Sequence, residues 1–174
     1  PEEAIAKAQT AVDKALDLDD RSGAAYSALA GIKQAKFDYE GAEATFQRAL
    51  ELNPNYATAY YWYGDLLSDQ LGRPEEALAQ HRKALALDPF SVGIMNSIAN
   101  DLEQLGQFDE ALAGYEKSLE VDPNFAESYD SIGTYYWFVS GQLDDAVVLF
   151  RKGITLDLGN PRYPGLLGLL FLDL

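Results

Sequence analysis

The chain has 174 residues, of which 48% are hydrophobic and 12% aromatic, and this composition excludes a disordered segment because it supplies ample material for a core. Its 28 Asp and Glu outnumber 13 Lys and Arg, and the net charge of −15 excludes a surface that binds nucleic-acid phosphates. The absence of cysteine excludes disulfides, thiolate metal sites and cysteine nucleophiles, but it says nothing about the cellular compartment.

One short phrase recurs along the chain. Pro54, Pro89 and Pro123 close the stretches "ELNP", "ALDP" and "EVDP", and they are spaced 35 and then 34 residues apart. A period near 34 residues indicates a repeat array. The prolines define four units with an incomplete unit at each end: residues 1–20, 23–56, 57–91, 92–125, 126–160 and 161–174.

The apolar spacing predicts the helices in chain order. Residues 1–20 have the pattern of a second helix without its partner, and each complete unit shows two blocks of apolar residues at three- and four-residue spacing. In the third unit, Ile98 and Leu102 belong to the first block and Tyr115 to the second, and Gly106 between them marks the end of the first helix.

Charge and proline mark the ends of the second helices. The pairs Glu75-Glu76, Asp109-Glu110 and Asp144-Asp145 place negative charge where a helix begins. The residue before each closing proline is pushed out of the helical region, so the second helices should end there.

Three positions depart from the pattern. Phe37 stands where the first unit should have its turn glycine, so we expect the first helix of that unit to end differently. The second and fourth units carry one extra residue before Gly72 and Gly141, which leaves the register open by one beyond Leu67 and Tyr136.

These features resemble the tetratricopeptide repeat, whose unit pairs two antiparallel helices around a Trp/Leu/Gly/Tyr, Ala, Phe, Ala, Pro signature. The third unit carries the match at Ile98, Ala99, Gly106, Phe108, Ala111, Tyr115, Leu119 and Pro123. The resemblance implies an all-α fold, an α-solenoid coiled as a right-handed superhelix of antiparallel helix pairs, forming a single array over residues 1–174.

Two glycines within predicted helices bear on the prediction that the two helices of each unit pack closely. Gly64 and Gly133 each cost roughly 1 kcal/mol relative to alanine, so they need a compensating reason. We expect close approach of the partner helix, with small residues such as Ala77 and Ala146 facing them.

The stretch "YYWY" must serve more than one purpose, because successive helical residues point about 100° apart. Tyr60 and Tyr63 fall on the packing positions of the repeat and are predicted core residues. Tyr61 falls where the resemblance places a concave groove. Trp62 lies between these faces, and its role stays open.

The resemblance implies that the first helix of each unit faces this groove, which would bind a segment of a partner protein. The predicted groove residues are Tyr61, Asp65, Asp69, Asn96, Asn100, Glu103, Glu127, Asp130 and Trp137. Side-chain amides at Asn96 and Asn100 can both donate to and accept from a peptide backbone. Because the acidic residues would attract Lys and Arg, we predict a protein–protein interaction scaffold for a basic, partly apolar segment. A carboxylate-binding clamp is rejected, since the groove positions lack its cations.

The sequence contains no recognisable catalytic motif. The one histidine, His81, occupies a second-helix position that is aromatic in the other units, which favours a packed side chain. No zinc motif, phosphate-binding loop or nucleophile elbow is present, and we predict a non-enzyme without a metal or cofactor.

The end of the chain supports an alternative function. The apolar helix predicted within residues 161–174 is about half the length needed to cross a bilayer, so no membrane insertion is expected. It could instead pair with another copy in a homodimer through Leu166, Leu169, Leu170 and Phe171. The start at Pro1 indicates a fragment, and parts of the sequence are similar to tetratricopeptide regions joined to bacterial signalling modules.

Overall fold

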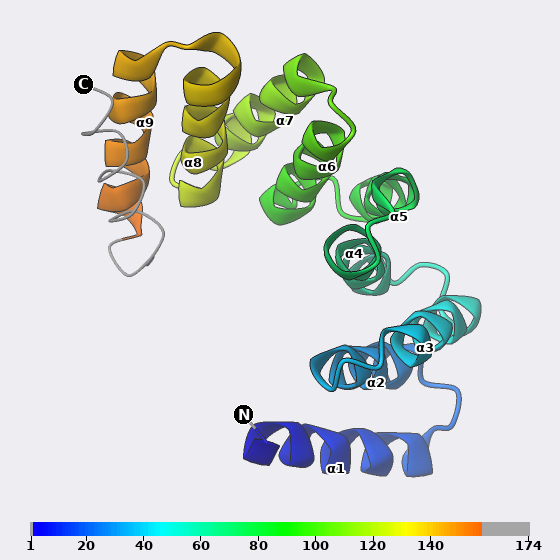
Figure 1. The fold of residues 1–174 in the computed structure, drawn as a ribbon. Helices are drawn as coiled ribbons and strands as arrows, with labels where there is room; N and C mark the ends of the chain where they lie inside the picture. The colour runs from blue at the N-terminus through cyan, green and yellow to red at the C-terminus, as the bar shows by residue number, and fades with distance from the viewer. Residues whose placement is uncertain (1, 158–174) are drawn as a thin grey trace. The chain divides into compact units, whose positions relative to one another are not determined.

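The computed structural model describes residues 2–157, and every regular element within them is helical (Figure 1). The described residues divide into two compact units, residues 2–89 and residues 90–157. The first unit contains α1 (Glu2–Leu18), α2 (Gly23–Ala35), α3 (Tyr39–Leu52), α4 (Ala57–Asp65), the π-helix η1 (Leu66–Gln70) and α5 (Pro74–Leu87). The second contains α6 (Val92–Gln104), α7 (Phe108–Val121), α8 (Ala126–Tyr135), the π-helix η2 (Tyr136–Ser140) and α9 (Leu143–Leu156).

Each unit is built from hairpins of two helices. In the first unit α2 packs on α3 and α4 on α5, and in the second α6 packs on α7 and α8 on α9. The loops within these hairpins are short, and short connections join antiparallel neighbours. The predicted helix boundaries are confirmed at the second helices, since α3, α5 and α7 each end two residues before the closing proline.

Small and aromatic side chains fill the space between the helices. The core of the first unit contains Ala30, Ala42, Phe46, Tyr63, Leu66, Leu67 and Ala77. In the second unit Ala146 and Phe150 form a core with Tyr136, Trp137, Leu143 and Val147 packed against it. Alanine at the helix crossings permits close approach of the helices, and the larger Phe, Tyr and Leu side chains fill the space between them.

The expectation for Phe37 was wrong. The first helix of that unit, α2, ends as α6 does, and Phe37 itself adopts the left-handed conformation with φ 63°. Gly72, Gly106 and Gly141 have φ of 62°, 75° and 70° at the corresponding turns. The turn therefore keeps the left-handed backbone conformation even though phenylalanine, unlike glycine, disfavours it.

The two extra residues are absorbed by the π-helices. In η1 the amide of Leu71 donates to the carbonyl of Leu66, five residues earlier, at 3.2 Å. A π-helical turn contains one more residue than an α-helical turn. Because η1 and η2 lie just before Gly72 and Gly141, the added residue leaves the turn and the following helix in place.

The close approach at the two helical glycines is confirmed, but the facing residues are rings and not alanines. A β-carbon added at Gly64 would overlap the imidazole of His81. One added at Gly133 would lie 3.0 Å from Cε1 of Phe150. Each glycine makes room for a ring on the second helix of its own hairpin.

Candidate functional site

The predicted groove residues lie on the first helices of three hairpins. Tyr61 and Asp65 belong to α4, Asp69 to η1, Asn96, Asn100 and Glu103 to α6, Glu127 and Asp130 to α8, and Trp137 to η2. Asp69, Asn100 and Glu127 are exposed, Asp130 is buried, and the other five are half-buried.

In the first unit, Tyr61 and Asp65 are organised around His81. The imidazole is 1% exposed, which confirms the predicted packed histidine. Its Nε2 lies 3.2 Å from the carbonyl oxygen of Tyr61 and 3.3 Å from Oδ1 of Asp65. Both neighbours are acceptors, so Nε2 carries the hydrogen and His81 fixes the position of the Asp65 carboxylate.

A cavity of about 590 Å³ opens beside Asp65. Its apolar lining comes from α1, α2 and α3 at Ala4, Ile5, Ala8, Ala28, Gly31, Ile32, Ala35 and Phe46, and its polar or aromatic lining from Gln34, Trp62 and Asp65. Trp62, whose role the sequence left open, is 39% exposed at this cavity. The cavity therefore joins an apolar floor to one indole ring and one carboxylate.

The other two aromatic residues of α4, Tyr63 and Tyr60, differ in how deeply they are buried. Tyr63 is buried in the core as predicted and stacks on Phe46 with ring centroids 5.9 Å apart. Tyr60 is only half-buried, with the ammonium of Lys83 5.4 Å from its ring centroid, so the core prediction holds only in part there.

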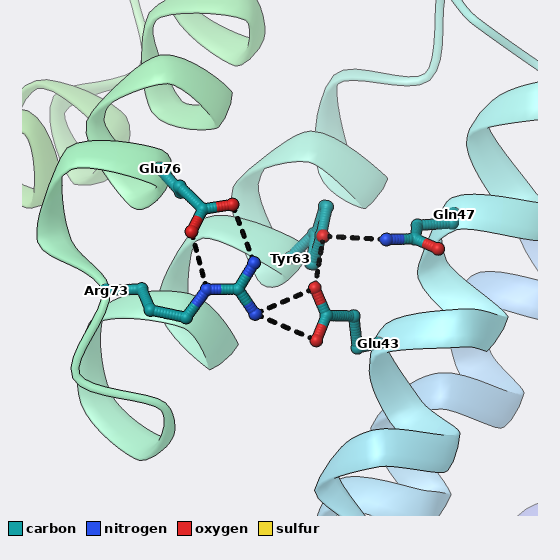
Figure 2. Close-up of polar contacts among 5 residues, drawn as sticks. All are labelled: Glu43, Gln47, Tyr63, Arg73 and Glu76. Atoms are coloured by element: carbon teal, nitrogen blue, oxygen red, sulfur yellow. Dashed lines mark hydrogen bonds and ion pairs between the residues drawn. The ribbon is translucent and has the colours of Figure 1, made fainter.

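A polar network joins α3, α4 and the start of α5 (Figure 2). Arg73 donates to both carboxylate oxygens of Glu43 at 3.0 and 2.9 Å, and its Nε and second terminal nitrogen each lie 2.6 Å from Glu76. The Tyr63 hydroxyl donates to Glu43 at 2.8 Å and accepts from Gln47 at 3.2 Å. Arg73 is thus held between two carboxylates, which lowers the pKa of Glu76 through its hydrogen bonds.

In the second unit, several predicted residues have partners within the fold. Asn96 Oδ1 accepts a hydrogen bond of 3.1 Å from Ser128, which also bonds to Ser118, so this amide helps to join α6 to α8. Glu103 accepts from the hydroxyl of Tyr115 at 2.9 Å. Burial and the neighbouring Glu103 raise the pKa of Tyr115 well above its ordinary value of 10.0.

Trp137 lies against aromatic neighbours. Its ring stacks on Phe138 with centroids 4.5 Å apart and meets Phe150 edge-on at 6.3 Å. A second cavity, of about 520 Å³, lies nearby between α6, α7, α8 and η2. Glu103, Phe108, Ala111, Tyr115, Thr134, Tyr135, Phe138 and Val139 line it. Of the predicted groove residues given above, Glu103 lines this cavity. The apolar Phe138 and Val139, where the second repeat has Asp69 and Gln70, were the signal in the sequence that could have located it.

Within residues 2–157, no group of three or more His, Cys, Asp or Glu side chains could hold a metal ion. No helix in this part of the chain is both long and apolar enough to span a bilayer. The proposed self-association residues Leu166, Leu169, Leu170 and Phe171 lie outside the described part of the chain.

Comparison with protein families identifies the repeat. Two tetratricopeptide repeat models match the chain, one over residues 35–92 and the other over residues 92–121. The chain is a tetratricopeptide repeat protein. The predicted all-α fold of antiparallel helix pairs is thereby confirmed, and proteins of this family generally serve as protein–protein interaction scaffolds and not as enzymes.

Solved structures of several other proteins share this fold. PilW, described as a widely conserved type IV pilus biogenesis factor, is 27% identical with a TM-score of 0.79 over 89% of this chain and 71% of its own. PilF of Pseudomonas aeruginosa is 22% identical with a TM-score of 0.82 over 93% of this chain and 73% of its own. YrrB, described as having an unusual peptide-binding site, is 23% identical with a TM-score of 0.71 over 94% and 84%. No curated protein matches the chain.

Proposed function

We propose that this tetratricopeptide repeat protein binds an extended segment of a partner protein along the first helices of its hairpins, and that the segment is basic and partly apolar. The fold supports a scaffold role, and YrrB, which shares it, is described as having a peptide-binding site. The chemistry of this chain's own first helices supports the character of the partner.

The distribution of charge carries the proposal. Among the first helices, residues 23–35 contain one cation, Lys33, and no carboxylate, whereas residues 57–70, 92–104 and 126–140 together contain six carboxylates and no Lys, Arg or His. The carboxylates are Asp65, Asp69, Asp101, Glu103, Glu127 and Asp130. A field of one sign raises the local concentration of oppositely charged ligands and repels those of like charge. A segment bearing Lys or Arg is therefore favoured over an acidic one.

The cavity beside Trp62 and Asp65 supplies a specific contact for such a residue. A Lys or Arg side chain can lay its hydrocarbon stem on the apolar floor while its charged head meets the carboxylate. The indole face adds a cation–π attraction worth roughly 0.5–2 kcal/mol. His81 holds the Asp65 carboxylate in place, which reduces the entropy lost when the segment binds.

Fluorescence anisotropy with two labelled 12-residue peptides tests the proposal. Both contain Leu and Ala at the same positions, and one has Lys where the other has Glu. We expect only the Lys peptide to bind, with an affinity that falls as salt rises. Asp65→Asn and Trp62→Ala should each weaken binding about three- to tenfold.

Glu75→Gln provides the matched control, because Glu75 is an exposed carboxylate on a second helix. It should leave the affinity unchanged. If Glu75→Gln weakens binding as much as Asp65→Asn does, the peptide is responding to net charge alone, and the proposed groove is wrong. Equal binding of the Glu peptide would contradict the proposal directly.

A further inference from the structure

The two units repeat each other with a constant offset. Gly72 and Gly141 occupy the same turn, and their numbers differ by 69. The same offset relates Phe37 to Gly106, which also share a turn conformation. Each residue in α3, α4 and η1 can therefore be compared with its counterpart 69 positions later.

This comparison shows that the two cavities share three counterpart positions, because Gln34, Phe46 and Asp65 line the first cavity and Glu103, Tyr115 and Thr134 line the second. The second cavity also reaches Ala111 and Tyr135, whose counterparts Ala42 and Leu66 are packed in the core of the first unit. In the first unit, Leu66 is fully buried and packs in one core cluster with Ala42 and Phe46. The counterparts of Ala42 and Phe46 are Ala111 and Tyr115, which line the cavity of about 520 Å³.

Tyr135 explains why the space is open. It is the counterpart of Leu66, but it is only half-buried, and its hydroxyl donates to Oδ1 of Asp109 at 2.8 Å. The ring is therefore held at the wall of the cavity and does not fill it. The volume lies within the range of about 300–1,000 Å³ that is usual for ligand pockets.

The rim of this cavity is apolar and exposed. Phe138 is 69% exposed, Val139 46% and Phe108 41%. The counterparts of Phe138 and Val139 in the first unit are Asp69 and Gln70. These solvent-facing positions are therefore polar in the first unit and apolar in the second. Exposed aromatic residues around a pocket are typical of anchor sites for a binding partner.

The surroundings of the cavity are acidic. Glu103 lies in its wall where the first unit has Gln34, and Asp109 holds Tyr135. Lys117 is the only Lys, Arg or His between residues 84 and 150, and it pairs with Glu120 on its own helix. An apolar anchor with a cationic neighbour would complement this site in both shape and charge.

We propose that this cavity, which we call the Tyr135 pocket, binds a Phe or Leu side chain of the partner segment while an adjacent Lys or Arg pairs with Glu103. The proposal rests on the proposed function and names a second, distinct contact for the same partner. The site of Trp62 and Asp65 takes a cation on an apolar floor, whereas the Tyr135 pocket takes an apolar side chain beside a cation.

¹⁹F NMR with a short peptide tests the pocket. The probe is acetyl-Lys-Lys-(4-fluorophenylalanine)-Leu-Lys-amide, and its Glu analogue is the charge control. Three substitutions install the first unit's own residues: Tyr135→Leu, Phe138→Asp and Glu103→Gln. We expect at least tenfold weaker binding for the first two and about threefold for Glu103→Gln, with little binding of the Glu analogue.

Phe90→Asp controls for the loss of any exposed phenylalanine, because Phe90 is 79% exposed and does not line the pocket. It should bind the probe like the unchanged protein. Circular dichroism verifies the fold of each variant. If Tyr135→Leu perturbs the fold, Phe138→Asp still tests the pocket, because Phe138 is largely exposed and its replacement should not disturb the core.

The possible failures are distinguishable. Unchanged binding in Phe138→Asp and Tyr135→Leu, together with weaker binding in Asp65→Asn, would overturn the Tyr135 pocket and leave the proposed function standing. No binding of either the probe or the 12-residue Lys peptide would overturn both. A fall in molar mass of Phe138→Asp by light scattering would assign the pocket to a second copy of the chain and overturn the present assignment.

Discussion

Phe37 keeps a conformation that the chain elsewhere gives to glycine. An L-residue in the left-handed region brings its β-carbon close to a carbonyl oxygen, at a cost of roughly 1–2 kcal/mol. The ring offers little in return, because it is 79% exposed and touches Tyr39 only edge-on, with centroids 6.3 Å apart. The hairpin from α2 to α3 therefore tolerates strain that the other hairpins avoid.

Replacing this residue should stabilise the protein. Phe37→Gly removes the strain, and part of the gain is lost because glycine is more flexible in the unfolded chain. We expect the free energy of unfolding to rise by roughly 0.5–1 kcal/mol, measured by urea denaturation. Phe37→Ala keeps the β-carbon and should give no gain; an equal gain from alanine would show that strain is not the cause.

Sequence reasoning at the level of single residues succeeded where spacing alone decides the outcome. Tyr63 and His81 fall on repeat packing positions, and both are buried. It failed at Gly64, because the pattern shows that a small residue is needed but not which side chain occupies the space. The ring of His81, and not Ala77, occupies it.

At the level of the helix, the π-helices η1 and η2 accommodate the one additional residue that makes the second and fourth repeats 35 residues long and not 34. The extra residue was visible in the spacing before Gly72 and Gly141, but its structural outcome was not. A loop insertion and a π-helical turn give the same sequence pattern, and the choice depends on whether flanking residues such as Leu66 and Leu67 stay buried. Both are fully buried, so the helix widens and the turn is unchanged.

Removing one residue from η1 should therefore be tolerated. Deleting Gln70, which is exposed, restores the spacing of the third repeat and allows ordinary α-helical bonds. We expect the free energy of unfolding to change by less than about 1 kcal/mol, whereas core losses cost about 2–5 kcal/mol. The measurement is urea denaturation followed by circular dichroism.

Deleting Asn100 from α6 is the matched control. This exposed residue lies in a helix without a π-helical segment, so its removal turns the following residues by about 100° and takes Leu102 out of the core. The control should lose at least about 2 kcal/mol. Comparable losses from both deletions would mean that the π-helical turn is required for packing.

Over the whole molecule, buried tyrosines make stability depend on alkaline pH. Burial raises the pKa of Tyr63 in the first unit, and burial with Glu103 raises that of Tyr115 in the second. In the unfolded chain both would ionise near pH 10, so that state binds fewer protons above this pH. The stability that comes from these raised pKa values is fully present below pH 10. It is lost as the pH rises through the pKa values that the two tyrosines have in the folded protein.

We expect the free energy of unfolding to decrease between pH 9.5 and 11.5, by up to about 1.4 kcal/mol per pH unit for each such tyrosine. The double variant Tyr63→Phe/Tyr115→Phe should be less stable at pH 8, since it lacks the hydrogen bonds to Glu43 and Glu103. The free energy of unfolding of this variant should decrease less steeply with pH than that of the unchanged protein. Urea denaturation at several pH values measures both effects, and parallel curves would contradict the assignment.

The polar network around Arg73 has a consequence for local motion. Its counterparts 69 residues later are Gln142 for Arg73 and Leu112 for Glu43, so the second unit lacks the arginine that bridges two carboxylates. Segments held by fewer cross-links open at a lower free energy and exchange their amide hydrogens faster. The turn after η2 should thus open more readily than the turn after η1. Under the proposed function, the first unit would offer a preformed contact, and the second would adjust to segments of differing sequence, which would let one scaffold recognise several related partners.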